Sequence, residues 1–347
     1  MMVEALDADQ ARTWRERGTP EVERLAGGIW SVPVPIPNNP LRYTLSYLVS
    51  GKRGIIVIDP GWDTDAGWTA LNDGLASAGA GLADLVGVVV THVHADHHGL
   101  SGRVREASGA WIAMHPAERD TLPARSQPPR RGLRAMVKAW LRSHGTPEEE
   151  LDRLARMPAT NQAQRYELAE PDVLLEDGDL VPLPGRSLRA VWTPGHTPGH
   201  LCLVDKSAGA LLTGDHLLPQ ISPHIGVQPG VHEPLGPYLR SLEKVAEFDA
   251  LAAYPAHEYR FRGIGARVAE LLQHHEERCA ELLAIVADLG KATTWQIAER
   301  LTWSKPWPRI GAMRVAAVAE TAAHVQYLVE RGDLERHDAE VGFFTLP

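Results

Sequence analysis

The chain has 347 residues, a length that fits one large domain or a domain plus an appendage, and its 44% hydrophobic and 23% charged residues are ordinary for a globular protein. Its net charge of −9 argues against a protein that coats nucleic acid, because phosphate binding needs a positive field. Two cysteines are too few for a secreted disulfide scaffold, so we expect two reduced thiols.

The sequence shows neither a membrane span nor an export signal. No apolar run approaches the ~20 residues that cross a bilayer. The first ten residues, MMVEALDADQ, lack a basic segment followed by an apolar core. We therefore expect a cytoplasmic protein with no membrane partner.

Short apolar runs alternate with helical spacing in the first third of the chain. Residues 1–24 predict a short helix or an arm, and residues 64–78 predict a helix. The apolar and β-branched runs predict strands over residues 29–36, 44–49, 55–58, 86–90 and 110–114.

The character of the sequence changes at residues 123–170, which predict an inserted helical subdomain. Within it, Thr146 and Glu149 have the spacing of a capping box. Beyond it the alternation returns, with strands expected within residues 172–183, 188–193, 200–205, 209–213 and 252–254 and a helix near 235–248. Two successive halves of strands and helices indicate an α/β core with layered sheets.

The last part of the chain is mostly helical. Helices are predicted at residues 264–289, at TTWQIAERL as a short capped helix, and at 310–331, the last ending at Gly332. An alternating segment, DLERHDAEVGFFTLP, predicts a terminal hairpin. Three helices and a hairpin indicate a winged-helix domain over residues 263–347, following a first domain over residues 1–262.

The segment THVHADHHG follows the strand predicted at residues 86–90. His92 and His94 are two residues apart at the strand end, so both imidazoles can face one point. Asp96 and His97 follow on the turn and the start of a helix. Imidazole and carboxylate side chains at this density indicate a site for Zn²⁺, or for iron or manganese.

Three later strand ends carry further residues of the same types. His196 follows Trp192 in VWTPGHTPGH, Asp215 follows LLTG, and His257 follows Tyr254 in LAAYPAHEY. If these strands end at a common edge of the sheets, the three side chains complete the cage that the first cluster begins.

The motifs HxHxDH, GH, GD and a late PxH, in this order, resemble those of the metallo-β-lactamase superfamily over about residues 27–263. The tail resembles the branch with a C-terminal winged helix, the lactamase-B-like type. This resemblance implies an αββα four-layer sandwich that binds two divalent ions, with zinc ahead of iron or manganese. One departure is Ala256, where the family often has glycine.

The resemblance also implies roles for individual residues. His92, His94 and His196 would bind the first metal, Asp96, His97 and His257 the second, and Asp215 would bridge them. The implied reaction is hydrolysis by a hydroxide held between the ions, with Asp96 as the catalytic proton carrier. Asp59 is a candidate to support the metal loop, and His98 and His224 are candidates to support the site or contact substrate.

Three functions remain open on the sequence alone. The first is hydrolysis of an ester, thioester or lactone bond in a small molecule. The second is phosphodiester or RNA cleavage, for which PPRRGLR with Lys138 and Arg142 is the dense basic segment. The third is DNA binding through the winged helix. The slight acidic excess of the tail instead favours a winged helix that packs on the core or forms a homodimer interface, so nucleic acid is not the expected partner.

Overall fold

The computed structural model describes residues 3–122, 133–156, 168–227, 231, 233–339 and 341–347. The chain divides into two compact units. The first contains Met1–Ser126, Arg165–Pro223 and Arg240–Ala269, and the second contains Gln127–Gln164, His224–Leu239 and Glu270–Pro347. No helix in the described part of the chain is long and apolar enough to cross a membrane.

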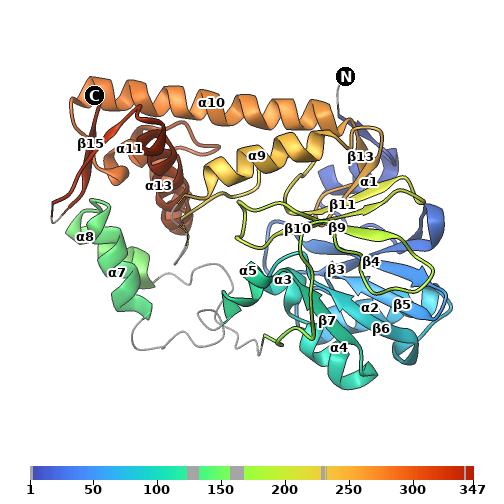
Figure 1. The fold of residues 1–347 in the computed structure, drawn as a ribbon. Coiled ribbons are helices and arrows are strands. Elements are labelled where there is room, and N and C mark those ends of the chain that lie inside the picture. The colour runs from blue at the N-terminus through green and yellow to red at the C-terminus, as the bar shows by residue number, and fades with distance from the viewer. Residues whose placement is uncertain (1–2, 123–132, 157–167, 228–230, 232, 340) are drawn as a thin grey trace. The chain divides into compact units, whose positions relative to one another are not determined.

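A seven-stranded sheet is formed mostly by the first half of the chain (Figure 1). Its strands follow chain order: β2 (Glu23–Arg24), β3 (Ile29–Pro35), β4 (Tyr43–Gly51), β5 (Gly54–Ile58), β6 (Leu85–Val89), β7 (Trp111–Met114) and β8 (Val173–Leu174). Strands β2 to β5 pair antiparallel, and β5 to β8 pair parallel. Parallel strands are covered on both faces, which explains the continuous apolar runs of β5 and β6.

A six-stranded sheet comes from the second half of the unit and the N-terminus. Its order is β1 (Glu4–Ala5), β13 (Phe261–Arg262), β12 (Ala252–Pro255), β11 (Ala210–Gly214), β10 (Leu201–Asp205) and β9 (Leu188–Trp192). Strands β11 and β12 are parallel, and the other pairs are antiparallel.

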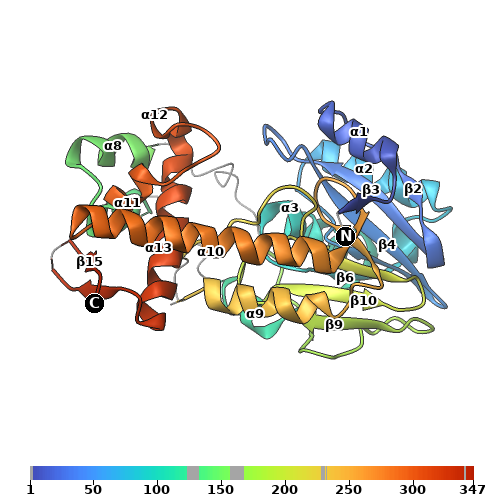
Figure 2. The same ribbon diagram turned by 90° about the horizontal axis from the view of Figure 1, so that it is seen from above.

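The two sheets face each other across an apolar core and are covered by helices outside (Figures 1 and 2). Helices α2 (Asp65–Ser77) and α4 (Ser101–Ser108) cover the seven-stranded sheet. The end of α9 (Leu235–Ala246) and the start of α10 (Ile264–Leu289) cover the six-stranded sheet. The predicted αββα arrangement is therefore confirmed. Short helices α1 (Ala8–Arg15), α3 (Ala95–His98) and α5 (Pro116–Arg119) complete the unit.

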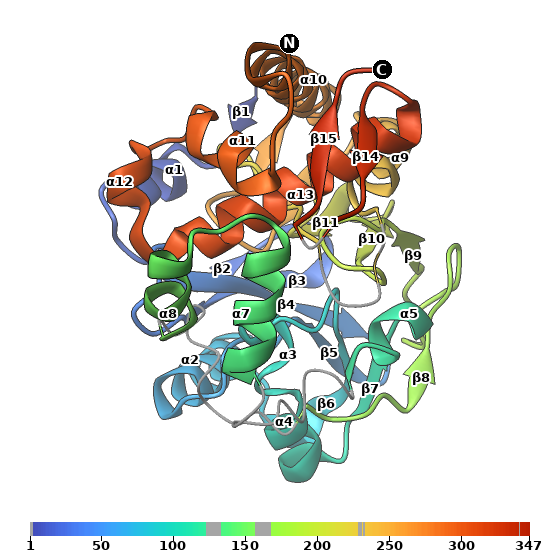
Figure 3. The ribbon, with the colours of Figure 1, turned by 90° about the vertical axis from the view of Figure 1, so that its left-hand side faces the viewer.

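The second unit is mostly helical (Figure 3). Besides most of α10, it contains α7 (Leu133–Ser143), α8 (Glu148–Arg156), α11 (Thr294–Arg300), α12 (Trp307–Ile310), α13 (Arg314–Arg331) and the hairpin β14 (Glu335–His337) with β15 (Phe343–Thr345). Leu141 of α7 and Leu151 of α8 pack in one core with Trp295, Trp307 and Val318. The inserted helices thus share their core with the C-terminal helices, and the winged-helix assignment stays a prediction.

The two helix caps expected in this unit have different outcomes. Thr293 and Gln296 form the reciprocal capping box of α11, with distances of 3.3 and 2.9 Å. The capping box expected for α8 is wrong. The helix begins at Glu148, so Thr146 lies one residue too early, and its buried hydroxyl has no hydrogen-bond partner among the described residues.

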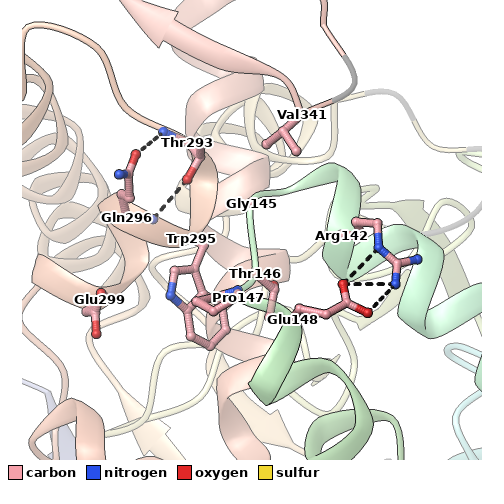
Figure 4. A pocket seen from close by; sticks show the side chains of 10 residues that line it. All are labelled: Arg142, Gly145, Thr146, Pro147, Glu148, Thr293, Trp295, Gln296, Glu299 and Val341. Atoms are coloured by element: carbon pink, nitrogen blue, oxygen red, sulfur yellow. Dashed lines mark hydrogen bonds and ion pairs between the residues drawn. The ribbon is translucent and has the colours of Figure 1, made fainter.

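A pocket of about 580 Å³ lies between the start of α8 and α11 (Figure 4). Trp295 and Thr146 line it, and the ion pair of Arg142 with Glu148 stands at its side. None of the seven candidate metal ligands lines this pocket. Its lining residues all belong to the second unit.

Candidate metal centre

The candidate ligands lie where strands of both sheets end. His92 and His94 follow β6, Asp215 follows β11, and His257 follows β12. Two backbone hydrogen bonds join the sheets at this edge: Leu201 N–H to Thr91 O at 2.9 Å, and Leu45 N–H to Ala256 O at 2.7 Å. This edge brings together side chains that are more than 160 residues apart in the sequence.

The first group contains three histidines. Nε2 of His92 lies 2.9 Å from Nδ1 of His94, and the same Nδ1 lies 3.1 Å from Nε2 of His196. In a tetrahedral zinc site with Zn–N bonds of about 2.05 Å, ligand nitrogens are about 3.3 Å apart. The three nitrogens are therefore close enough together to bind one divalent ion.

The second group contains Asp96, His97 and His257. Oδ2 of Asp96 lies 3.5 Å from Nε2 of His257 and 3.8 Å from Nε2 of His97. Asp96 and His97 are adjacent on the first turn of α3, while His257 arrives from the end of β12. The mixed oxygen and nitrogen donors suit zinc, iron or manganese.

Asp215 lies between the two groups. Its Oδ1 is 3.2 Å from Nε2 of His257 and 3.5 Å from Nε2 of His97, and its Oδ2 is 3.7 Å from Nε2 of His196. One carboxylate oxygen thus faces each group. This is the geometry expected of a bridging ligand.

Buried polar atoms within the cluster support a metal more directly. Nε2 of His97, Nε2 of His257 and Oδ1 of Asp215 have no hydrogen-bond partner in the described part of the chain. Leaving such atoms unsatisfied costs about 1–3 kcal/mol each, more where a charge is involved. Cation binding would remove this cost, so the donor set fits the expected zinc, iron or manganese ions.

The electrostatics of the two groups differ. Burial, together with the neighbouring imidazoles His97, His94 and His196, holds the pKa of His92 well below its ordinary value, which favours the neutral form that binds metals. Burial would also lower the pKa of His97, but the nearby carboxylates of Asp215, Asp96 and Asp59 outweigh it and raise that pKa well above its usual range.

Asp59 fixes the orientation of two loop residues next to the site. Its Oδ1 accepts the backbone N–H of Thr91 at 2.7 Å, and its Oδ2 accepts the Thr91 hydroxyl at 2.7 Å and Nδ1–H of His97 at 2.8 Å. A carboxylate only accepts, so Nδ1 of His97 must carry a proton, and Nε2 is the ring nitrogen that faces the other candidate ligands. Asp59 itself has a left-handed backbone with φ 51°.

Other supporting residues carry no recognisable motif. Nδ1 of His257 donates to Tyr43 O at 3.0 Å, and the Thr44 hydroxyl donates to Asp96 O at 2.8 Å. Nε2 of His200 accepts the backbone N–H of Asp215 at 3.1 Å. Glu118 accepts the backbone N–H groups of Val93 and Gly199, which lie on two loops that carry candidate ligands. None of these supporting residues is among the expected site residues, although His200 lies in the VWTPGHTPGH segment. Strand and loop contacts between distant segments leave no local pattern.

His98 and His224 lie differently from the expected ligands. Both ring nitrogens of His98 are engaged outside the cluster, with the Ser101 hydroxyl at 2.8 Å and Ala169 O at 3.0 Å. This geometry argues against substrate contact by His98. His224 belongs to the second unit and lies 3.5 Å from the carboxylate of Glu320, so its contact with substrate stays a prediction.

Comparison with solved structures shows the same architecture over nearly the whole chain. A metallo-beta-lactamase family protein from Thermus thermophilus is 31% identical, with a TM-score of 0.75 over 92% of this chain and 99% of that one. A beta-lactamase domain protein from Burkholderia ambifaria, 24% identical, has the same fold, with a TM-score of 0.79 over 99% of this chain and 98% of that one.

Curated relatives match over shorter stretches. The lactamase-like protein adaB of Aspergillus niger is 36% identical over 110 residues, 32% of each chain. The beta-lactamase-like protein 2 homolog of Caenorhabditis elegans is 27% identical over 161 residues, 46% of this chain and 51% of that one. The matches thus span about a third and about half of these relatives.

A family model matches more than half of the chain. The model described as the metallo-beta-lactamase superfamily matches residues 39–257, which contain all seven candidate ligands. Fold, motif order and family match agree, and the chain belongs to the metallo-β-lactamase superfamily of hydrolases.

Proposed function

We propose that this protein is a hydrolase that holds two divalent ions and cleaves an ester, thioester or lactone bond of a small molecule. The observation that carries the proposal is the convergence of seven histidine and aspartate side chains that could bind metal, with one oxygen of Asp215 toward each group. Zinc is the first candidate, and iron and manganese are the alternatives, because mixed imidazole and carboxylate ligation accepts all three.

In this proposal each of the two ligand groups binds one metal ion. His92, His94 and His196 would hold one ion, Asp96, His97 and His257 the other, and Asp215 both. Bound divalent ions supply a water of lowered pKa and a Lewis acid for the developing oxyanion. Asp59 and the carbonyl of Tyr43 keep His97 and His257 in the tautomer that leaves Nε2 facing the cluster.

Asp96 is the proposed proton carrier. Its carboxylate is 13% exposed, so it lies within the cluster and keeps access to solvent. It would take a proton from the attacking water and return it to the leaving group, so that the protons balance over one turnover.

A covalent intermediate on cysteine is not supported by the structure. Cys202 and Cys279 are both buried and form no disulfide. Burial raises the pKa of each thiol to about 12, so both stay protonated near neutral pH and are poor nucleophiles. Direct attack by water is the mechanism that the chain's own residues favour.

The choice of an acyl over a phosphodiester substrate rests on the basic residues. Arg134 and Lys138 both pair with Asp152, at 2.8 and 2.9 Å, and Arg142 pairs with Glu148 at 2.7 Å. Each of these three basic side chains already pairs with a carboxylate of the neighbouring helix, Asp152 or Glu148, so the pairs leave a net charge of only about +1. The rest of the PPRRGLR segment, up to Gly132, lies outside the described residues.

A substrate panel tests the proposal. The full chain, with its metal content measured, is assayed on a lactone, a thioester, a p-nitrophenyl ester and bis-p-nitrophenyl phosphate. We expect acyl substrates to be hydrolysed, activity to be lost on chelation, and activity to return with added zinc, iron or manganese. A preference for the phosphodiester, together with salt-sensitive cleavage of RNA, would replace the acyl proposal with the nuclease alternative.

A further inference from the structure

We propose that Glu118 is a positioning residue that holds the two loops of the first ligand group at their working distance. The inference rests on the proposed function, because it assigns Glu118 to one of the two metal positions. Glu118 lies on α5, is fully buried, and belongs to none of the motifs that identify the family.

The two oxygens of Glu118 bind one loop each. Oε1 accepts the backbone N–H of Val93 at 2.8 Å, and Oε2 accepts the backbone N–H of Gly199 at 2.8 Å. Val93 stands between the ligands His92 and His94, and Gly199 comes three residues after the ligand His196. One carboxylate therefore joins the loop after β6 to the loop between β9 and β10, which belong to different sheets.

The loop of His196 also approaches α5 too closely for any side chain at position 199. A Cβ there would lie 2.3 Å from the backbone N of Glu118 and 2.7 Å from its Cβ. Position 199 therefore requires glycine, because the loop backbone there lies directly against the backbone of α5. This close approach leaves the loop of His196 little freedom to move while the hydrogen bond from Gly199 N–H to the Glu118 carboxylate is intact.

Hydrogen bonds from N–H groups to an ionised carboxylate are about twice as strong as those between neutral groups. An amide in place of the carboxylate keeps one acceptor and turns an NH₂ group toward the other N–H. Glu118→Gln should therefore release one loop while preserving side-chain volume.

The second group is held by other residues. Thr44 and Tyr43 of β4 contact Asp96 and His257, and Asp59 contacts His97. Loss of the Glu118 contacts should consequently weaken the first metal position and leave the second close to its original affinity. This selectivity separates a positioning role from a general role in stability.

Cobalt binding to the full chain supplies the test. The metal-free protein is titrated with Co²⁺, and the visible absorption reports the number, affinity and ligand field of the bound ions. References are His196→Ala, which removes a first-group ligand, and His257→Ala, which removes a second-group ligand. We expect Glu118→Gln to lower the affinity for one of the two cobalt ions about 10-fold or more. Its visible spectrum should shift toward that of His196→Ala.

Asp205→Asn is the matched control. Asp205 is also a fully buried carboxylate, and it accepts the backbone N–H of Ala208 at 3.0 Å and pairs with Arg186 at 2.5 Å. This variant should lose stability while retaining both cobalt affinities. Gly199→Ala breaks the same contact from the other side and should reproduce the spectrum of Glu118→Gln.

The outcomes separate the inference from the proposed function. If the wild-type chain binds two cobalt ions and Glu118→Gln matches Asp205→Asn, or weakens both ions equally, the positioning role is overturned. If the wild-type chain binds fewer than two, the two-metal proposal fails, and the assignment of Glu118 to one position fails with it. Circular dichroism of each variant verifies that the fold is retained before titration.

Discussion

Each of the two units buries a cluster of histidines, and only one of these clusters resembles a metal site. In the first unit, ring nitrogens of His97 and His257 point at the carboxylates of Asp96 and Asp215. In the second unit, His275 and His324 come from α10 and α13, and Nδ1 of His275 lies 3.0 Å from Nε2 of His324.

The difference lies in where the lone pairs point. Nδ1 of His324 donates to Glu320 O at 2.9 Å, so its Nε2 accepts from His275 and both its nitrogens are used. Nε2 of His275 has no hydrogen-bond partner among the described residues, but it belongs to none of the candidate metal groups found there. The three candidate metal groups among the described residues all lie in the first unit. Buried imidazoles therefore indicate a metal only where free nitrogens and carboxylate oxygens converge on one point, and histidine content alone does not distinguish the two clusters.

The largest effect should come from removing a ligand. His196→Ala should lower metal content and reduce hydrolysis by at least about 100-fold, because even residues that only orient a ligand typically contribute 10- to 100-fold. His275→Gln, in the other cluster, should leave the metal content unchanged. Elemental analysis and the acyl assay measure both variants. Equal metal loss in the two would remove the distinction drawn between the clusters.

A smaller effect is expected for Asp59→Asn. Asparagine tolerates the left-handed backbone of this position, so the turn should survive. Its NH₂ group would oppose the N–H or O–H donors that Asp59 now accepts, and the orientation of His97 would loosen. We expect metal affinity to fall about 10- to 100-fold. Chelator competition measures it, with Asp205→Asn as the control, and an unchanged affinity would refute the orienting role.

The smallest effect concerns stability of the second unit in acid. Burial, followed by the neighbouring His324, lowers the pKa of His275 to about 3, compared with an unfolded value of 6.5. Between these values the unfolded chain binds a proton that the folded chain does not, so stability falls as the pH falls below 6.5. From pH 7 to pH 5 the loss should be about 2 kcal/mol.

Denaturant unfolding of the full chain at the two pH values measures this loss. His275→Gln should show a flatter pH dependence than wild type, whereas His337→Gln, at a partly exposed histidine of the terminal hairpin, should behave like wild type. A wild-type pH dependence in His275→Gln would show that other groups control acid stability.

Local patterns predicted many of the elements. The long helix at residues 264–289 has the predicted bounds, and Thr293 caps α11, because periodicity and caps depend on neighbouring residues. The prediction that Thr146 caps α8 is wrong for an equally local reason, because the helix begins one residue later than the spacing of Thr146 and Glu149 suggests. Boundaries are set by which neighbouring backbone groups find partners, and a pattern of residue types leaves that choice open by a residue.

The sequence by itself determined the chemistry of the centre, because imidazole and carboxylate donors after strand ends in this order suit divalent metals and few other ligands. Only the tertiary structure decided which atoms face each other. The position of Asp215 between the two ligand groups, the engagement of His98 elsewhere and the joining of two loops by Glu118 all depend on contacts between segments far apart in the chain. Such contacts follow from how the two sheets pack, and no local run of residues encodes them.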